Sequence, residues 1–483
     1  MPRNGELGPF LYLPIEVASR ELHAKLLLTW FAVGLGFEVV IGWKRMINRN
    51  LRAMPPGIVV FKTLTGNDGD VMAEARAAGH CVAAIDEEVP GLVTMKQKLR
   101  WVTERSVAAS DLIFAVGEEH REALLHFYPG HAERYRVVGN PRWDLLRPEL
   151  RGSHAAEVAA IRARHAPFIL INTNFAALNS ARRTPEETAR WFVKTGRVDT
   201  RKPEDVVFLD EMFQMERANT AAVKALLKEL PGRFPDYTIV LRPHPMERVE
   251  TWNEFLRDIP RTQMIRDGAA VPWIMAADAL VHTNCTTGVE AYALDRPAIS
   301  LQPARLGLND IYLANLINYR TETTDETLDV LARLIGREPS DPAYPVEFAA
   351  TFARFFAGTS GPFACERIVQ ALREELPLSP SSPERPAWQP QPGYRWKTRT
   401  REHHAQVMPE IDEPEVAKIL ESFSQALGEK RQFQVEPCGQ LVFHVHGAPA
   451  RANHAADAER RSWLGRLWRS AKRLPSTPVA ARP

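Results

Sequence analysis

The stretch Ala277–Ala291, ADALVHTNCTTGVEA, decides the fold of this chain, because its pattern is that of a strand, a polar turn and a helix. Free backbone N–H groups and the positive end of the helix dipole make such a helix start an anion site. Thr286 and Thr287 stand at this start, and Glu290 follows on the first turn, where it could reach a ribose hydroxyl. The simpler alternative is an ordinary capped helix, since threonine is a common cap.

A second strand, Thr238–Glu247 (TIVLRPHPME), ends in an arginine and a histidine that alternate with two prolines. Proline fixes its own φ, so this turn is stiff and loses little entropy when it holds a ligand. Arg242 and His244 suit phosphate oxygens, the arginine through its planar fork of donors. A turn whose histidine caps a neighbouring helix would explain the motif without a ligand. Two phosphate-type sites on successive strand ends favour a nucleotide mono- or diphosphate.

Strand-like and helix-like segments alternate on both sides of these motifs, which indicates parallel sheets covered by helices. Ligands of such sheets bind at the carboxyl ends of the strands. We therefore expect an α/β fold with two Rossmann-like domains that face a cleft, followed by a linker and a helical basic tail. The expected divisions are residues 1–150 (amino-terminal Rossmann-like domain), 151–376 (carboxyl-terminal Rossmann-like domain), 377–413 (proline-rich linker) and 414–483 (helical extension and basic amphipathic tail).

The composition is that of a soluble globular protein of two or three domains, with 483 residues, 45% hydrophobic and 25% charged. A net charge of +2 does not favour nucleic acid as a partner. The wide spacing of the cysteines argues against a disulfide framework and a zinc site. We expect a cytoplasmic protein, because neither a signal peptide nor a membrane-spanning apolar run is evident. The four cysteines are Cys81, Cys285, Cys365 and Cys438.

As a set, the motifs resemble a known family. RPHP, followed by HTNCTTGVEA and RPAISL, is similar to the nucleotide-binding half of GT-B glycosyltransferases and their relatives, which include teichoic-acid transferases and sugar-nucleotide 2-epimerases. More closely, the chain resembles bacterial surface carbohydrate (lipopolysaccharide or capsule polysaccharide) biosynthesis proteins. The further matching stretches are PIEVASRELHAKLLL, GFEVVIGWKR, AAIDEE, VVGNPRWDLLRPE and FILINTNF. The resemblance runs from about Phe10 to Glu375 and covers neither the linker nor the tail.

This resemblance implies a GT-B-like glycosyltransferase. The carboxyl-terminal domain would bind a CMP-, CDP- or UDP-linked sugar donor, and the amino-terminal domain a glycan or lipid-linked glycan acceptor. On the acceptor side the implied positions are Arg20 and Asp86. The donor-binding residues that it implies are Asn172, Asn174, Arg242, His244, Thr286, Thr287 and Glu290.

Sugar transfer needs a general base for the acceptor hydroxyl, and a carboxylate that faces the cleft is the right residue type. Glu16 follows the first strand, and Glu87 and Glu88 end the fourth, so all three are catalytic candidates by position. A solvated helix cap is the alternative for the DEE run. His23 and Lys25 lie on the helix after the first strand, and we interpret them as surface or packing residues.

We expect neither an essential metal nor a cofactor. The sequence lacks the GxxxxGK[ST] motif of P-loop nucleotide hydrolases. No DxD motif stands where a metal-dependent GT-A glycosyltransferase would need it, and the DEE run, which could mimic one, lies in the half expected to bind the acceptor. The arginine, the histidine and the helix start would instead neutralise the charge of the leaving phosphate.

Two other functions stay open on the sequence alone: a 2-epimerase-like enzyme that acts on sugar nucleotides, and a non-catalytic scaffold that binds nucleotide sugars within a glycan assembly complex. The basic stretch 457–474 places Trp463, Leu464, Leu467 and Trp468 at helical spacing. Such a helix could bring the protein to the anionic surface of the inner membrane. The alternatives are an unstructured end or a helix that packs on the parent domain.

Overall fold

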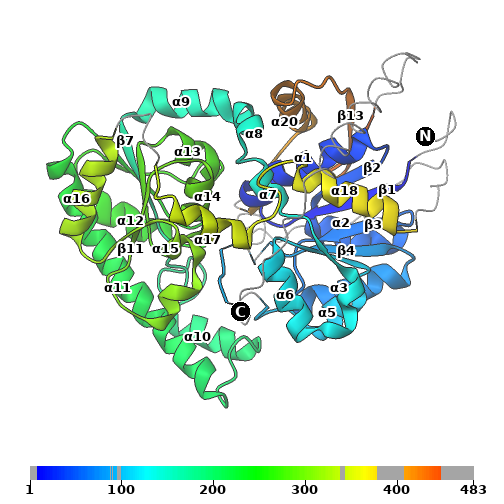
Figure 1. The fold of residues 1–483 in the computed structure, drawn as a ribbon, viewed down its shortest axis with the longest axis horizontal. Coiled ribbons are helices and arrows are strands. Elements are labelled where there is room, and N and C mark those ends of the chain that lie inside the picture. The colour runs from blue at the N-terminus through cyan, green and yellow to red at the C-terminus, as the bar shows by residue number, and fades with distance from the viewer. Residues whose placement is uncertain are drawn as a thin grey trace, which may run out of the picture.

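Two β-sheets, each flanked by helices, form the two lobes of the molecule (Figure 1). The computed structural model describes residues 8–87, 89, 91–94, 99–337, 343–377 and 407–447. The predicted α/β class with two parallel sheets is confirmed. Among the described residues, no helix has the length and apolar character needed to cross a membrane.

The first sheet consists of β1 (Phe10–Ile15), β2 (Glu38–Trp43), β3 (Gly57–Phe61), β4 (Cys81–Ile85), β5 (Leu112–Ala115), β6 (Tyr135–Val137), β13 (Phe433–Gly439) and β14 (Val442–Gly447). Its strand order is β13-β14-β2-β1-β3-β4-β5-β6, and β1 to β6 are mutually parallel. These six strands are short and almost wholly buried, as expected where both faces are covered. The strand order reverses between β1 and β3, and ligands bind at the carboxyl ends of strands at such a switch point.

The second sheet consists of β7 (Phe168–Asn172), β8 (Thr238–Arg242), β9 (Thr262–Met264), β10 (Ala279–His282), β11 (Ala298–Leu301) and β12 (Tyr319–Thr321). All its strands are parallel, in the order β12-β11-β10-β7-β8-β9. This is the order of a dinucleotide-binding sheet, and its switch point lies between β7 and β10. Both sequence motifs therefore end on this sheet, at the carboxyl ends of β8 and β10.

Helices connect the strands within each lobe and join the two lobes. In the first lobe they are α1 (Ala18–Gly34), α2 (Lys44–Asn50), η1 (Leu51–Ala53), α3 (Gly66–Ala77), α5 (Glu104–Ala109), α6 (Glu118–Phe127) and η2 (Pro129–Arg134). The connection to the second lobe contains α7 (Pro141–Asp144), α8 (Pro148–Arg151), η3 (Gly152–His154) and α9 (Ala155–His165).

The second lobe contains α10 (Pro185–Lys194), α11 (Pro203–Arg233), α12 (Val249–Leu256), α13 (Ala270–Ala276), α14 (Thr286–Ala293), η4 (Gly307–Ile311), α15 (Leu313–Leu316), α16 (Thr324–Ile335) and α17 (Glu347–Phe355). The chain then returns to the first lobe through α18 (Ala364–Glu375) and α20 (Glu413–Ala426). The carboxylate of Asp144 on α7 accepts the backbone N–H groups of Ala364 and Cys365 at 2.9 and 2.8 Å, which fixes the start of α18.

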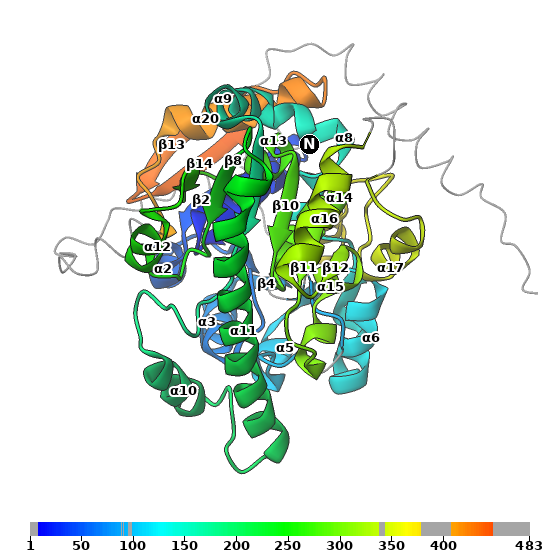
Figure 2. The same ribbon diagram turned by 90° about the vertical axis from the view of Figure 1, so that its left-hand side faces the viewer.

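The carboxyl-terminal extension, expected to be helical from residue 414 onward, contains a β-hairpin as well as α20. Figure 2 shows β13 and β14 beside β2, to which β14 pairs antiparallel. In the stretch VFHVHG, apolar residues alternate with histidines, and this period of two is that of a strand. Arg431 stacks on Trp30 of α1, with its guanidinium carbon 3.3 Å from the ring centroid, and donates a hydrogen bond to the Trp30 carbonyl. The extension is therefore packed on the first lobe. Residues 448–483, which include the predicted membrane-binding stretch, and most of the linker lie outside the described residues.

Candidate functional site

Residues that follow the carboxyl ends of strands in the two sheets approach one another between the lobes. Arg182 is close enough to Arg45 and Glu16 for their charges to act on it. Burial and the charges of Arg183 and Arg45 lower the pKa of Arg182, whereas the charge of Glu16 raises it. Arg182 follows β7 in the second lobe, whereas Glu16 and Arg45 follow β1 and β2 in the first. We call this region, where the carboxyl edges of the two sheets meet, the interlobe site.

The loop after β4 lies directly on the second lobe. Its Gly91 carbonyl accepts the N–H of Leu313 at 2.7 Å, and Leu92 forms an antiparallel bridge with Tyr312. Gly91 has a φ of +98°, and a Cβ there would come within 2.9 Å of Thr286 Cγ2. A glycine is therefore needed for this loop to reach the start of α14.

The start of α14 has the features that the sequence predicts for an anion site. Cys285 precedes the helix and makes no side-chain cap to it, while Thr286 and Thr287 are half-buried on its first turn. Burial raises the pKa of the Cys285 thiol, and the nearby charge of Arg20 lowers it. Arg20 belongs to α1, so the first lobe contributes a cation to this helix start. An anion at this position would be close to the helix start of the second lobe and to the cation of the first lobe.

A buried pair behind α14 fixes its geometry. His282, at the end of β10, is fully buried and lies 2.6 Å from Asn318 through Nε2, while its Nδ1 accepts the N–H of Cys285 at 3.4 Å. Burial lowers the pKa of His282 to about 4, so the ring is neutral and donates from Nε2 to the amide oxygen. A Cβ on Gly288 would lie 2.2 Å from Nε2 of His282.

Replacing Gly288 with alanine is therefore expected to lower the free energy of unfolding by about 2–4 kcal/mol, because it crowds the core and separates a buried hydrogen-bonded pair. Chemical denaturation measures this change. Gly307→Ala is the matched control, since a Cβ at Gly307 would meet no atom within 4 Å. Equal stability of the two variants would contradict the role given to the His282–Asn318 pair.

The switch point of the second sheet holds two buried oxygen atoms that have no hydrogen-bond partner among the described residues. They are Oδ1 of Asn172, at the end of β7, and Oγ1 of Thr283, directly after β10. A buried polar atom without a partner costs about 1–3 kcal/mol, so most such atoms in proteins are satisfied. Both atoms lie at the switch point, which is where ligands of such parallel sheets bind. Asn174, the other predicted amide, is half-buried in the loop that follows β7.

The RPHP turn holds its histidine through backbone contacts. His244 donates its N–H to Oε1 of Glu247 at 3.0 Å, and its Nδ1 accepts the N–H of Met246 at 3.2 Å. Because Nδ1 is an acceptor, the neutral ring carries its proton on Nε2. His244 is half-buried. This geometry suits the predicted contact with a phosphate oxygen.

Arg242 has another set of partners. Its two terminal nitrogens donate to the carbonyls of Asp267 and Gly268 at 2.7 and 2.9 Å, and the guanidinium stacks on Trp273. Burial lowers the pKa of Arg242 to about 10, and the charges of Asp267 and Glu157 oppose this shift. The structure thus shows Arg242 bracing the loop after β9. Its predicted contact with phosphate stays a prediction.

Glu290 and Arg142 form an ion pair between α14 and α7, at 2.7 Å, with both side chains largely buried. Arg142 belongs to the GNPRWD stretch that leads from the first lobe to the second. The pair therefore ties this connection to α14. A ribose hydroxyl bound by Glu290, as predicted, would have to share the Glu290 carboxylate with Arg142.

Glu247, which the sequence analysis did not single out, organises the turn. It is fully buried, and Oε1 accepts from the hydroxyl of Thr173 at 2.8 Å and the N–H of Phe175 at 3.1 Å, as well as from His244. Its Oε2 accepts the indole N–H of Trp252 at 2.8 Å. Glu247 thus ties the loop after β7 to the RPHP turn. The sequence hints at this role of Glu247 only in that a glutamate follows Pro245, the second proline of RPHP, by two positions.

A second buried carboxylate, Glu216 on α11, supports the same loop. It accepts the N–H groups of Ala177 and Leu178, the latter at 2.9 Å. Burial raises the pKa of Glu216 to about 8, and the charge of Glu247 adds to the shift, although the two N–H groups oppose it. Glu216 is therefore protonated in the folded protein at neutral pH.

This shift predicts a dependence of stability on pH. Between the ordinary pKa of 4.5 and about 8, the folded state holds a proton that the unfolded state has lost. The free energy of unfolding therefore falls as pH rises through this range, by up to about 1.4 kcal/mol per pH unit, and the contribution is constant above it. Glu216→Gln should flatten the slope measured by denaturation at pH 5.5, 6.5 and 7.5. Glu229→Gln, an exposed change on the same helix, should keep the slope of the unmodified chain.

The switch point of the first sheet places Glu16 against Lys62. Glu16 follows β1, Lys62 follows β3, and Oε2 of Glu16 lies 2.9 Å from Lys62 Nζ and 3.6 Å from Lys44 Nζ. The Glu16 side chain is 50% exposed, whereas Lys62 is 9% exposed. Burial alone would raise the pKa of Glu16, but the two lysines outweigh it and lower the pKa. Glu16 is thus an ionised, accessible carboxylate at the interlobe site.

The DEE run after β4 differs from Glu16. Glu87 is buried and lies 3.6 Å from Nζ of Lys25, which is itself buried, so Lys25 packs in the interior, one of the two roles expected, and is also a charge partner of Glu87. Asp86 is buried beside it, and Glu88 lies outside the described residues. Of the two catalytic candidates that the structure describes, Glu16 has the more accessible carboxylate.

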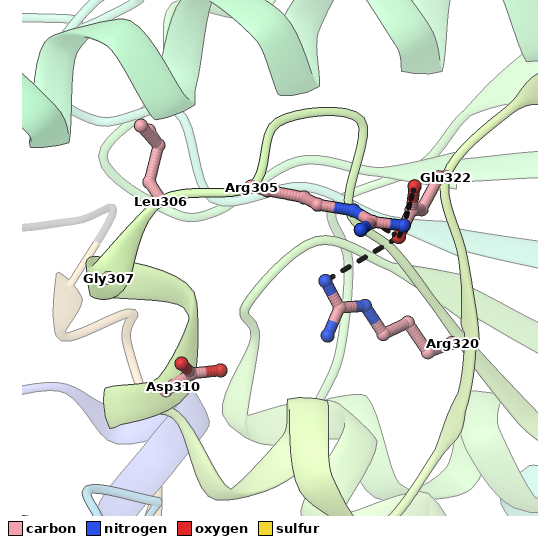
Figure 3. Close-up of a pocket in the computed structure, with 6 residues that line it drawn as sticks. All are labelled: Arg305, Leu306, Gly307, Asp310, Arg320 and Glu322. Carbon is pink, nitrogen blue, oxygen red and sulfur yellow. Dashed lines mark hydrogen bonds and ion pairs between the residues drawn. The ribbon is translucent and has the colours of Figure 1, made fainter.

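A pocket of about 560 Å³ opens at the carboxyl ends of β11 and β12 (Figure 3). The side chains of Arg305 and Arg320 converge on Glu322, to which Arg305 donates twice, at 2.9 and 3.0 Å. The volume of the pocket lies in the range of small-molecule sites. The pocket lies on the same edge of the sheet as Thr283. It is lined by Arg305, Leu306, Gly307, Asp310, Arg320 and Glu322.

Several solved structures are similar in fold. UDP-GlcNAc 2-epimerase of Methanocaldococcus jannaschii, in complex with UDP-GlcNAc and UDP, is 12% identical with a TM-score of 0.46, over 75% of this chain and 99% of that one. HepE of Anabaena, in complex with UDP, is 12% identical with a TM-score of 0.40, over 76% and 99%. The wall teichoic acid polymerase TagF is 11% identical with a TM-score of 0.44, over 76% and 88%. No protein-family model and no curated protein matches the sequence.

Proposed function

We propose that this protein is a glycosyltransferase that moves a sugar from a CMP-, CDP- or UDP-linked donor to a cell-surface glycan or its lipid-linked precursor. The observation that carries the proposal is the pair of buried oxygens, Asn172 Oδ1 and Thr283 Oγ1, that have no partner in the described part of the chain and lie at the switch point of the second sheet. They lie beside a helix start that suits phosphate. A polar ligand with an anionic group would satisfy both features.

The donor would lie along the carboxyl edge of the second sheet. Its phosphates would bind at the start of α14, near His244, and its base in the pocket at β11 and β12. Adjacent strands are about 4.8 Å apart, so the pocket lies roughly 10 Å from the end of β10, which suits a nucleoside diphosphate. Arg20 and Arg182 would add positive charge from both sides of the interlobe site.

Filling the pocket tests this arrangement. Gly307→Phe places a ring where a Cβ would meet no atom within 4 Å, so the fold should persist while the base is displaced. We expect at least a tenfold loss of nucleotide affinity by calorimetry, about 1.4 kcal/mol. Gly130→Phe, on η2 of the first lobe, is the matched control, since its Cβ position is equally open. Unchanged affinity in Gly307→Phe would place the base elsewhere.

Catalysis would rest on position and charge. Glu16 would accept the proton of the acceptor hydroxyl as that hydroxyl attacks the anomeric carbon of the donor sugar. The start of α14, the Nε2–H of His244 and Arg20 would stabilise the negative charge on the departing phosphate. Lys62 and Lys44 would hold the Glu16 carboxylate in its ionised form.

Product analysis tests the activity itself. The full-length chain is incubated with UDP-, CDP- and CMP-sugars, with and without a lipid-linked glycan extract, and the products are separated by mass spectrometry. Transfer predicts free nucleotide and an enlarged glycan only when the acceptor is present. An epimeric sugar without acceptor would favour the epimerase instead. Binding without turnover, together with dispensable Glu16 and Glu87, would favour the scaffold.

A further inference from the structure

The carboxyl-terminal hairpin brings together two imidazoles and a carboxylate, from His444 and His446 on β14 and Glu436 on β13. One ligand atom from each side chain lies within 4.8 Å of the other two. The strand register explains this convergence. Glu436 pairs with His444, and His446 lies two residues further along, so all three project from the same face of the sheet.

A fourth residue, Glu38 at the start of β2, holds His444 in place. Its Oε2 lies 2.7 Å from Nε2 of His444, and the two side chains are 13% and 5% exposed. A carboxylate that accepts one ring N–H is the usual support of a metal-binding histidine, because it orients the ring and leaves the other nitrogen for the metal. Here that other nitrogen is Nδ1.

His446 has a ring nitrogen that is prepared for a cation. Its Nδ1 lies 3.2 Å from the carbonyl of Gly447, so in the neutral ring Nδ1 carries the proton and Nε2 has a lone pair. Nε2 is buried and has no hydrogen-bond partner among the described residues. It lies 3.7 Å from Oε1 of Glu436. A lone pair that faces a carboxylate is repulsive, and a proton or a metal ion between the two atoms relieves this repulsion.

We propose that Glu436, His444 and His446 bind one divalent transition-metal ion, for which Zn²⁺ is the best fit, with Glu38 orienting His444. Imidazole nitrogen and carboxylate oxygen are ligands of this ion. Two ligands at about 2.0–2.1 Å from a tetrahedral zinc are about 3.4 Å apart, close to the distance between His446 and Glu436. Three protein ligands leave a fourth position for water.

The proposed metal site lies near the amino end of β2, whereas Glu16 and Lys62 follow the carboxyl ends of β1 and β3. β14 pairs antiparallel with β2, so His446 comes close to the amino end of β2, whereas the interlobe site is at the carboxyl ends. The ion would tie β13 to β14 within the hairpin, while the Glu38–His444 contact links this hairpin to a strand 406 positions earlier in the chain. Its role would be structural, independent of the proposed sugar transfer.

The test uses the full-length chain, treated with EDTA, dialysed and titrated with ZnCl₂ at pH 7.5. Bound zinc is measured by elemental analysis and the Tm by calorimetry. We expect one more tightly bound zinc per chain in the unmodified protein than in His446→Ala. At a hundredfold excess of free zinc over Kd, the Tm of the unmodified protein should rise by about 5 °C, and that of the variant should not. His126→Ala, an exposed histidine on α6, should behave like the unmodified chain.

Two further variants keep the proposal falsifiable should His446→Ala fold poorly. Glu38→Gln, which weakens only the support of His444, should lower zinc affinity 10–100-fold, and Glu436→Gln, which removes a ligand, should lower it further. Equal zinc content in the unmodified chain and in His446→Ala would overturn the site. So would a zinc-dependent rise in Tm that persists in His446→Ala or in Glu436→Gln.

Discussion

Glu16→Gln is expected to lower the rate of the proposed sugar transfer about 10²–10⁴-fold, the contribution of a general base, while the proposed nucleotide binding is retained. Glutamine has the size of glutamate but cannot accept the proton of the acceptor hydroxyl. Glu16 is half exposed, so the change should cost little stability. Single-turnover kinetics with a saturating donor measure the rate, and calorimetry measures the affinity for the nucleotide.

The pH profile gives a second readout of Glu16. Because Lys62 and Lys44 lower its pKa, the carboxylate is ionised throughout the neutral range. The acidic limb of kcat/KM is therefore expected below pH 4.5, the ordinary value for this group. Glu122→Gln, an exposed change on α6, is the control and should leave the rate unaltered. An unchanged rate in Glu16→Gln would remove this residue from the mechanism and leave Glu87 and Glu88 as candidates.

Glu247→Ala is expected to lower the free energy of unfolding by about 3–5 kcal/mol. Glu247 is fully buried, and its loss leaves the hydroxyl of Thr173, the N–H groups of Phe175 and His244, and the indole of Trp252 without their acceptor. The stiff RPHP turn would also lose the bond that positions it. Weaker nucleotide binding should therefore accompany the loss of stability.

Two comparisons separate this effect from a general one. Glu250→Ala changes an exposed glutamate on α12 and should alter the free energy of unfolding by less than about 0.5 kcal/mol. Glu247→Gln keeps one carbonyl oxygen as an acceptor and should fall between the unmodified chain and Glu247→Ala. If denaturation finds Glu247→Ala as stable as Glu250→Ala, the carboxylate does not organise the turn.

The sequence contains enough local signal to predict the two parallel sheets. Strands such as FILIN and TIVLR are short apolar runs that end in polar residues, and this pattern places Asn172 and Arg242 at the same edge of one sheet. The turn after β10 is equally local, and the helix begins at Thr286, where its threonines predict it. These features depend on neighbours along the chain, which is why they could be predicted.

The partners of these residues depend on contacts far apart in sequence. An arginine fork binds carbonyls as readily as phosphates, so the sequence could not show that Arg242 braces Asp267 and Gly268. Lys25 has the spacing of a packing residue, and only the fold brings its ammonium group to Glu87. The docking of β14 on β2 joins segments separated by a linker that carries no structural signal.

The most direct test of the central claim is nucleotide binding by the full-length chain and by Thr283→Val, measured by calorimetry with CMP, CDP and UDP. Because Oγ1 of Thr283 is buried without a partner among the described residues, its removal should not lower the Tm of the free protein. We predict that at least one nucleotide binds and that Thr283→Val binds it about tenfold more weakly, a loss of about 1.4 kcal/mol. Binding of none of the three, or equal binding by Thr283→Val, would contradict a nucleotide-sugar site at this edge of the sheet.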